Sequence, residues 1–156
     1  MRVGFGYDIH PLILERKLIL GGEVIPYQKG LDGHSDADVL IHSLIDALLG
    51  AAGEGDIGQH FPDNDERYKD ISSLKLLENT YEILKRKKLI INNIDVSLVL
   101  EEPRIAPFTL SMKNNIAQVL KISSEKVNIK ATTNEKMGFI GRKEGVASYC
   151  VVSLND

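Results

Sequence analysis

Two side chains near the N-terminus have the chemistry and the spacing of metal ligands. Asp8 and His10 lie two positions apart in residues 4–11, a segment typical of the end of a first β-strand. Because side chains alternate along a strand, a carboxylate and an imidazole two residues apart project from one face and can share a cation. The pair alone is a weak signal, since a surface carboxylate beside a histidine bonded to backbone has the same sequence.

The chain then predicts a helix that presents a further histidine. The polar loop of residues 30–38 leads into apolar positions that recur at helical spacing from Val39 to Ala51. Ser35 is placed to cap this helix, with Asp38 at the capping-box position. We expect Asp36 and Asp38 in its first turn, where acids complement the helix dipole.

His42 lies two turns into this predicted helix and is the candidate third ligand, although a single histidine on a helix is ordinarily a polar-face residue. Asp8, His10 and His42 form an Asp-His-His set with a fourth position open, which is the pattern of a catalytic zinc site. Asp38 and Asp46 lie four residues to either side of His42. Asp46 is a candidate to orient an imidazole by accepting its second N–H, and a solvent-facing acid is the alternative. His60 is left unassigned.

Two further segments have residues suited to a phosphorylated ligand. Residues 55–58 and 61–65 form a long loop in which glycines allow close backbone approach, although ordinary turn chemistry explains the same residues. Residues 130–142 gather two threonines, a carboxylate, a guanidinium and glycines after a predicted strand. These groups suit phosphate, and a glycine-rich hairpin before the last strand is the alternative.

The intervening segments alternate between strand and helix patterns. A Gly-Gly turn joins two short strands, and longer strands alternate apolar residues. The expected strands are residues 17–20, 23–27, 93–100, 127–133 and 146–154, and the expected helices are residues 72–88 and 107–120, with a short turn at 123–126.

Length and composition exclude several classes. The 156 residues suit one domain over residues 1–156, and the net charge of −3 argues against a nucleic-acid partner. The basic run at residues 85–88 ends a helical pattern, where cations favour the dipole. Cys150, the one cysteine, lies in an apolar run, which predicts a buried thiol in a reducing compartment. The chain has neither signal-peptide character nor an apolar run of membrane-spanning length. We expect a cytoplasmic protein without a membrane partner, or one from a plastid-type organelle after removal of a transit peptide.

The sequence resembles the family of 2-C-methyl-D-erythritol 2,4-cyclodiphosphate synthases, enzymes of non-mevalonate isoprenoid biosynthesis. The likeness covers nearly the whole chain without large gaps. It is carried by residues 2–10, 33–38, 42, 46–51, 55–58, 61–63, 130–139 and 141–142.

The resemblance implies a fold, an assembly and a reaction. The fold would be α+β, a mixed β-sheet with helices packed on one face, in a homotrimer whose sheets surround the threefold axis and whose sites lie at subunit interfaces. The reaction would be cyclisation of 4-diphosphocytidyl-2-C-methyl-D-erythritol 2-phosphate to 2-C-methyl-D-erythritol 2,4-cyclodiphosphate with release of CMP, which makes the enzyme a phosphorus-oxygen lyase.

The resemblance also assigns roles to residues. Asp8, His10 and His42 would hold zinc, and Glu135 would help hold a second divalent ion, magnesium or manganese. His34 and Thr133 would be catalytic, stabilising the transition state, and His34 and Ser35 would meet phosphate. The methylerythritol group would contact Asp56, Ile57, Gly58, Phe61, Pro62, Asp63, Asn64 and Asp65. The cytidine pocket, on a neighbouring subunit, would be Leu100, Glu101, Glu102, Pro103, Arg104, Ile105, Ala106, Ala131 and Thr132. Further substrate contacts would come from Asp8, His10, Thr133, Asn134, Glu135, Phe139 and Arg142.

Two departures from the family pattern affect the expected ligands. Leu100 is bulkier than the usual residue, and Glu101 and Glu102 add negative charge beside the cytidine pocket. Tyr7, often Phe in the family, adds a hydroxyl near the threefold axis, where a central cavity would be the place for an isoprenoid diphosphate.

Two other functions fit the same residues. An open zinc site can activate water, so a zinc phosphoesterase is one alternative. A metal-dependent nucleotide-binding subunit without turnover is the other.

Overall fold

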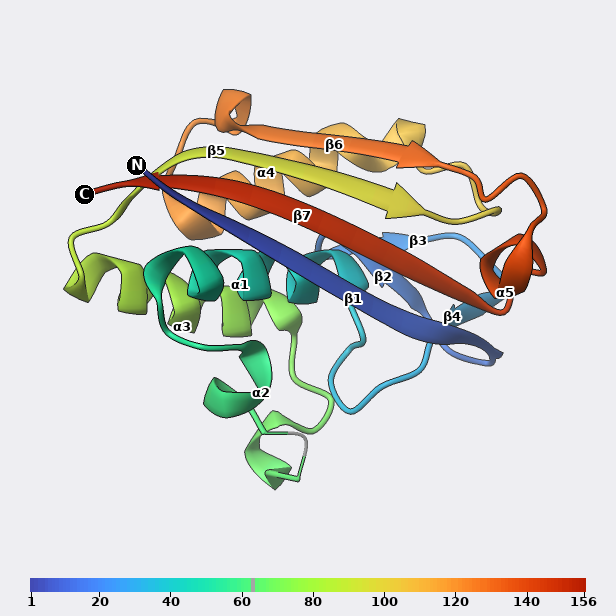
Figure 1. Ribbon diagram of the computed structural model, residues 1–156. Coiled ribbons are helices and arrows are strands. Elements are labelled where there is room, and N and C mark those ends of the chain that lie inside the picture. Colours follow the sequence, from blue (N-terminus) through green and yellow to red (C-terminus); the bar gives the residue numbers. More distant parts are fainter. Residues whose placement is uncertain (63) are drawn as a thin grey trace.

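A computed structural model describes residues 1–62 and 64–156 of the chain. Its framework is a five-stranded sheet in the order β4-β1-β7-β5-β6, with a separate two-stranded hairpin of β2 and β3 (Figure 1). The strands are β1 Arg2–Leu14, β2 Leu18–Leu20, β3 Glu23–Ile25, β4 Lys29–Leu31, β5 Ile90–Val99, β6 Val127–Thr132 and β7 Gly145–Asn155. The helices are α1 Val39–Ala52, α2 Ile57–His60, α3 Ser73–Arg86, α4 Thr109–Leu120 and α5 Gly138–Gly141, with 3-10 turns η1 Glu66–Tyr68, η2 Ala106–Phe108 and η3 Ser124–Lys126.

The sheet is mixed, and helices cover one of its faces. β1 and β5 both pair antiparallel with β7, whereas β5 pairs parallel with β6. In Figure 1 the long helices α1, α3 and α4 all lie on the same side of the sheet. The expected α+β fold with helices on one face is therefore confirmed.

Alternation along the strands explains why one face is covered. In β5 the side chains of Ile94, Val96 and Leu98 are fully buried toward the helices. In β1 the matching positions are Gly4 and Gly6, where a Cβ, if present, would lie 1.9 Å from the carbonyl oxygens of Ala47 and Ser43. Glycine at these positions lets α1 lie directly on the backbone of β1.

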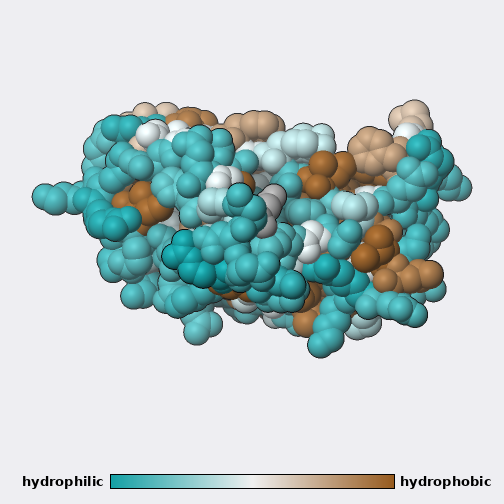
Figure 2. All heavy atoms as spheres, turned by 90° about the horizontal axis from the view of Figure 1, so that it is seen from below, coloured by the Kyte–Doolittle hydropathy of each residue, from teal (hydrophilic) through white to brown (hydrophobic). Residues whose placement is uncertain are grey.

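The outer face of the sheet leaves large apolar side chains exposed. Val3, Phe5 and Tyr7 alternate with the glycines of β1, and Tyr149 and Val151 lie beside them on β7. The ring centroids of Tyr7 and Tyr149 are 5.0 Å apart. Figure 2 shows a different side, seen from below, where the surface is mostly hydrophilic and its hydrophobic patches are small and separate. Large apolar side chains exposed together, as on the outer face of β1 and β7, mark an interaction site.

The first strand is longer than the sequence suggested. β1 continues through Pro11 to Leu14 and pairs there with β4, a strand that falls where the sequence predicted a polar loop. Asp8 and His10 therefore lie within the strand rather than at its end. The extension is possible because Pro11 has no backbone N–H that needs an acceptor, while its carbonyl oxygen accepts from Asp32 N at 2.9 Å.

The N-terminus of α1 also differs from the prediction. The capping residue is Asp38, whose carboxylate accepts from Ile41 N at 3.2 Å, and Ser35 lies before the helix. Asp36 and Asp38 consequently precede the first turn. Asp38 is fully buried. This burial is possible because its carboxylate also accepts from the backbone N–H groups of Gly21 and Gly22, at 3.0 and 2.7 Å. It ties the β2-β3 turn to α1.

The raised pKa of Asp38 makes the connection between the β2-β3 turn and α1 sensitive to pH. Burial and the nearby charge of Asp36 raise the pKa from 3.8 to about 6, against the effect of its backbone donors. A carboxyl with a raised folded-state pKa contributes most stability below the unfolded value, and that contribution is lost as pH rises through about 6. We expect the difference in the free energy of unfolding between the native protein and the Asp38→Asn variant to fall between pH 4 and pH 7, as measured by urea titrations. A constant difference across this range would contradict the raised pKa.

Other local predictions have mixed outcomes. Helices α3 and α4 and the strands β5, β6 and β7 match the expected segments to within a few residues. Cys150 is buried, and burial raises the pKa of its thiol. The glycine-rich hairpin that was the alternative for the segment before β7 is not formed, and the chain instead makes the short helix α5 there. None of the described helices has the length and apolar character needed to cross a membrane.

Candidate functional site

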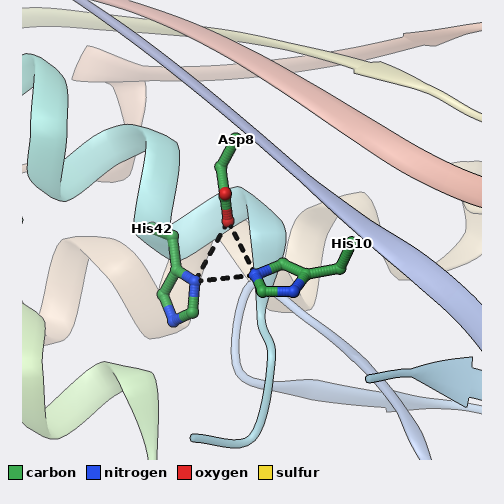
Figure 3. Close-up of side chains that lie close together, drawn as sticks. All are labelled: Asp8, His10 and His42. Carbon is green, nitrogen blue, oxygen red and sulfur yellow. Dashed lines mark hydrogen bonds and ion pairs between the residues drawn. The ribbon is translucent and has the colours of Figure 1, made fainter. Parts of the chain in front are cut away.

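Three side chains from β1 and α1 converge on one point (Figure 3). Oδ2 of Asp8 lies 3.0 Å from both Nε2 of His10 and Nδ1 of His42, and the two nitrogens are 3.2 Å apart. Taken together, the ligand atoms fall within 4.8 Å of one another. The predicted set of Asp8, His10 and His42 is therefore assembled, and its donors, one oxygen and two imidazole nitrogens, suit zinc.

The protonation of His10 suits a metal ligand. Its Nδ1 lies 2.7 Å from the carbonyl oxygen of Asp32, which can only accept a hydrogen bond. Nδ1 must therefore carry a proton, and in the neutral ring Nε2 then has a lone pair directed at Asp8 and His42. Metal-binding histidines commonly bond to backbone through the second nitrogen in this way.

The charge on Asp8 is strongly favoured. Burial by itself disfavours ionisation, but in the metal-free site hydrogen bonds and positive charge from protonated His10 and His42 outweigh it and lower the pKa of Asp8 to about 2. The same pairing raises the pKa of His10 above its ordinary value, against the effect of burial. The site thus favours a cation beside Asp8, which a bound divalent ion would also provide.

The triad opens into a pocket of about 250 Å³ between α1, α2 and the loop before α1. Asp46 of α1 makes no hydrogen bond to His42, so it does not take the orienting role for which its spacing made it a candidate. Its Oδ1 instead accepts from the backbone N of Ile57 at 2.8 Å and so fixes the start of α2. Asp56 caps α2 by accepting from Gln59 N at 3.0 Å. The pocket is lined by Asp8, His10, Gly33, His34, Ser35, His42, Asp46, Ile57, Gly58, Phe61, Tyr68 and Leu76.

The expected phosphate contacts and loop residues take specific places around this pocket. His34 lines it and bonds through Nε2 to the carbonyl oxygen of Asp65 at 3.2 Å. Phe61 packs edge-on against Tyr68, with ring centroids 5.5 Å apart. Of the predicted methylerythritol contacts, Ile57, Gly58 and Phe61 line the pocket, and Asp63 lies outside the described residues. His60, left unassigned, bonds through Nε2 to the carbonyl oxygen of Glu54.

Sequence reasoning missed the groups behind His42. Nε2 of His42 faces the hydroxyls of Ser35 and Ser73, at 3.1 and 2.9 Å. Ser73 is fully buried at the start of α3, and its hydroxyl also donates to Asp36. Arg16 holds the loop from the other side by donating to the carbonyl oxygens of Gly33 and Ser35, at 3.1 and 2.6 Å. From the sequence, Ser73 is only a serine at the start of a predicted helix, and the fold is needed to place it against His42.

A second, separate pocket of about 430 Å³ contains most of the residues expected around cytidine. It lies where β5 and β6 end, and it shares no lining residue with the first pocket. Thr133 lines this pocket and is therefore grouped apart from the triad and His34 within one chain. The lining residues are Leu100, Glu101, Pro103, Arg104, Ile105, Ala106, Thr109, Ile129, Lys130, Ala131, Thr132 and Thr133.

The two acids that depart from the family pattern are engaged in local bonds. Oε1 of Glu101 accepts from the backbone N of Asn134 at 2.7 Å and of Lys136 at 3.3 Å. Glu102 forms an ion pair with Lys143 at 2.7 Å, which lowers the pKa of the carboxyl. Of the two acids, Glu101 lines the second pocket and Glu102 does not, while Leu100, only 5% exposed, is a buried part of the pocket wall.

The remaining predicted residues follow β6 in the turn before α5. Glu135 accepts a bond from the hydroxyl of Thr133 at 3.2 Å and has a positive φ of 50°. Asn134 donates to the carbonyl oxygen of Met137 at 2.8 Å. Phe139 is half exposed in α5, and Arg142 pairs with Glu144 at 2.8 Å.

Fold and site together define an α+β subunit with a potential metal-binding triad at the mouth of a polar pocket. A model of the YgbB family matches residues 1–155. A 2-C-methyl-D-erythritol 2,4-cyclodiphosphate synthase from Desulforamulus reducens is 58% identical over 154 residues, which cover 99% of this chain and 98% of that protein. The chain belongs to the YgbB family.

Solved structures are similar over almost the whole chain. The bifunctional IspDF from Campylobacter jejuni superposes with a TM-score of 0.95 at 44% identity, covering 98% of this chain and 42% of that protein. The CDP complex of IspF from Plasmodium falciparum superposes with a TM-score of 0.86 at 33% identity, covering 98% of this chain and 94% of that one. The expected family likeness is therefore confirmed.

Proposed function

We propose that this chain converts 4-diphosphocytidyl-2-C-methyl-D-erythritol 2-phosphate to 2-C-methyl-D-erythritol 2,4-cyclodiphosphate and CMP. The observation that carries the proposal is the convergence of Asp8, His10 and His42 at a pocket, in a chain 58% identical to a named synthase over nearly its full length. By its bond changes the enzyme is a cyclising phosphorus-oxygen lyase.

Two divalent ions are part of this proposal. The donor set of Asp8, His10 and His42 suits zinc, and the carboxylate of Glu135 is available for magnesium or manganese at the diphosphate. When bound, such ions neutralise phosphate oxygens and polarise the phosphorus that is attacked.

The chain's own residues would fold and orient the substrate. In the reaction, an oxygen of the 2-phosphate bonds to the β-phosphorus, and the bond from that phosphorus to the oxygen bridging to CMP breaks. The attacking phosphate is already ionised, so no side-chain base is required. Holding the two phosphates in an attack geometry is worth up to about 7 to 11 kcal/mol in favourable intramolecular systems. His34 and the start of α2, fixed by Asp46, would hold this geometry from the pocket wall.

A complete site would require more than one copy of the chain. The triad and His34 line one pocket, whereas Thr133 and the cytidine residues line another with no residue in common. The apolar outer face of β1 and β7 offers a surface for assembly. We propose a homotrimer in which the second pocket of one copy adjoins the triad of the next, and sedimentation equilibrium should give three chain masses.

Product analysis tests the function directly. Purified protein loaded with zinc and incubated with substrate and Mg²⁺ should release CMP and give the paired ³¹P resonances of a cyclic diphosphate. Linear phosphates that incorporate oxygen from labelled water would instead identify a phosphoesterase. CDP binding by calorimetry without any product would identify a nucleotide-binding subunit.

A further inference from the structure

A chain of hydrogen bonds runs from His42 to a carboxylate that does not face the pocket's metal-binding atoms. Nε2 of His42 lies 2.9 Å from Oγ of Ser73, and that hydroxyl donates to Oδ1 of Asp36. The other carboxylate oxygen, Oδ2 of Asp36, accepts from the backbone N of Ser73 at 2.9 Å. The chain therefore links α1, the preceding loop and the first residue of α3.

The direction of each bond follows from which groups can donate. An ionised Asp36 only accepts, so the hydroxyl proton of Ser73 must be directed toward it. The oxygen of Ser73 can then only accept from Nε2 of His42, which must carry the ring proton. The neutral imidazole has one proton, and Nδ1 is therefore left with a lone pair directed at Asp8 and His10.

We propose that Asp36 and Ser73 are positioning residues that hold His42 with its proton on Nε2, so that Nδ1 is free to bind a divalent cation. The inference rests on the metal centre of the proposed function. It adds the groups that fix the orientation and the protonated nitrogen of one ligand, His42. His10 is prepared differently, by the backbone carbonyl of Asp32. Groups behind a metal ligand that fix its orientation typically change metal affinity 10- to 100-fold when altered.

Burial and backbone bonds make this arrangement rigid. Ser73 is fully buried, and the side chain of His42 is 12% exposed. Asp36 is also fixed through its own backbone N, which donates to the carbonyl oxygen of Ile71 at 3.1 Å. Ser35 is a secondary acceptor, because its hydroxyl lies 3.1 Å from Nε2 of His42 and already accepts from Ala37 N.

The substitution Asp36→Asn tests the proposal with almost no change in shape. Both carboxylate oxygens of Asp36 accept from backbone, Oδ2 from Ser73 N at 2.9 Å and Oδ1 from Asp38 N at 3.2 Å. The shorter bond favours the amide oxygen in the place of Oδ2, so the amide NH₂ should face Oγ of Ser73. The Ser73 hydroxyl then points its proton at Nε2 of His42 and favours the ring with its proton on Nδ1. We expect zinc affinity, measured by competition with a chromophoric chelator, to fall 10- to 100-fold. We also expect the visible absorption bands of the cobalt-substituted protein to change.

Ser43→Ala is the matched control. Ser43 is a fully buried serine on the same helix as His42, but its hydroxyl bonds to Ser148 at 2.7 Å and to Leu40 O. It should keep the parent zinc affinity and cobalt spectrum, whatever its effect on thermal stability. If Asp36→Asn does not fold, Ser73→Ala replaces it, with a smaller expected loss because Ser35 remains near Nε2.

The outcomes separate this inference from the metal centre itself. A folded Asp36→Asn protein with zinc affinity within about twofold of the parent, and an unchanged cobalt spectrum, would overturn the inference and leave the metal centre intact. A parent protein without stoichiometric zinc binding would overturn the metal centre as well.

Discussion

Replacing His42 with alanine should abolish stoichiometric zinc binding and lower turnover by about 10³-fold or more. The substitution removes one of the three proposed ligands. It leaves Asp8 and His10, whose Oδ2 and Nε2 atoms are 3.0 Å apart, without their common partner. Metal ions contribute several kcal/mol of charge stabilisation to such reactions, and each 1.36 kcal/mol is a factor of ten in rate. Zinc content by mass spectrometry and CMP release would measure both effects.

His60→Ala is the control for this prediction. His60 belongs to α2 near the same pocket, but its ring bonds to the carbonyl oxygen of Glu54 and not to the triad. It should keep one zinc per chain. Full zinc occupancy in the His42→Ala protein would reject the three-ligand assignment. His42 lies on the helix-covered side of the sheet, opposite the apolar outer face, so the proposed trimer should persist in this variant.

The second large effect is expected from Gly6→Ala, which should prevent α1 from packing on β1. The new Cβ would lie 1.9 Å from the backbone oxygen of Ser43 and 2.8 Å from the backbone N of Ala47, and neither atom can move without the helix. Overpacking of flexible core side chains costs about 1 to 3 kcal/mol, and a clash with backbone should exceed this range. We expect a large drop in the urea midpoint or insoluble protein. Zinc binding should also be lost, since this contact brings His42 to Asp8.

The same substitution at another glycine should have the opposite sign. Gly50 lies within α1, and a Cβ there would meet no atom within 4 Å. Gly50→Ala should therefore stabilise the protein by about 0.5 to 1 kcal/mol, because alanine favours the helix. Equal stability of Gly6→Ala and the parent would show that α1 does not approach β1 as closely as described.

Local patterns were sufficient for much of the fold and for one pair of the triad. Alternation identified β5, since Ile94, Val96 and Leu98 share the buried face. The two-residue spacing placed Asp8 and His10 on one face of a strand, whereas the meeting of His42 with them was expected from the ligand types and from the family resemblance. These features depend on strand and helix periodicity, which a sequence carries directly.

Other parts depend on contacts that no local pattern encodes. Asp38 looked like an ordinary helix-start acid, yet its bonds to Gly21 and Gly22 come from a hairpin elsewhere in the chain. Asp46 had the spacing to support His42, but the nearby N–H of Ile57 takes its carboxylate. The actual support, Ser73, lies 31 residues from His42 and meets it only through the packing of α3 against α1.

X-ray absorption at the zinc edge of the zinc-loaded protein tests the central claim, that Asp8, His10 and His42 hold one divalent ion. We expect one zinc per chain, with two imidazole nitrogens at about 2.0 to 2.1 Å and oxygen ligands at about 2.0 to 2.2 Å. A first shell that contains sulfur, or one made of oxygen alone without imidazole scattering, would contradict it.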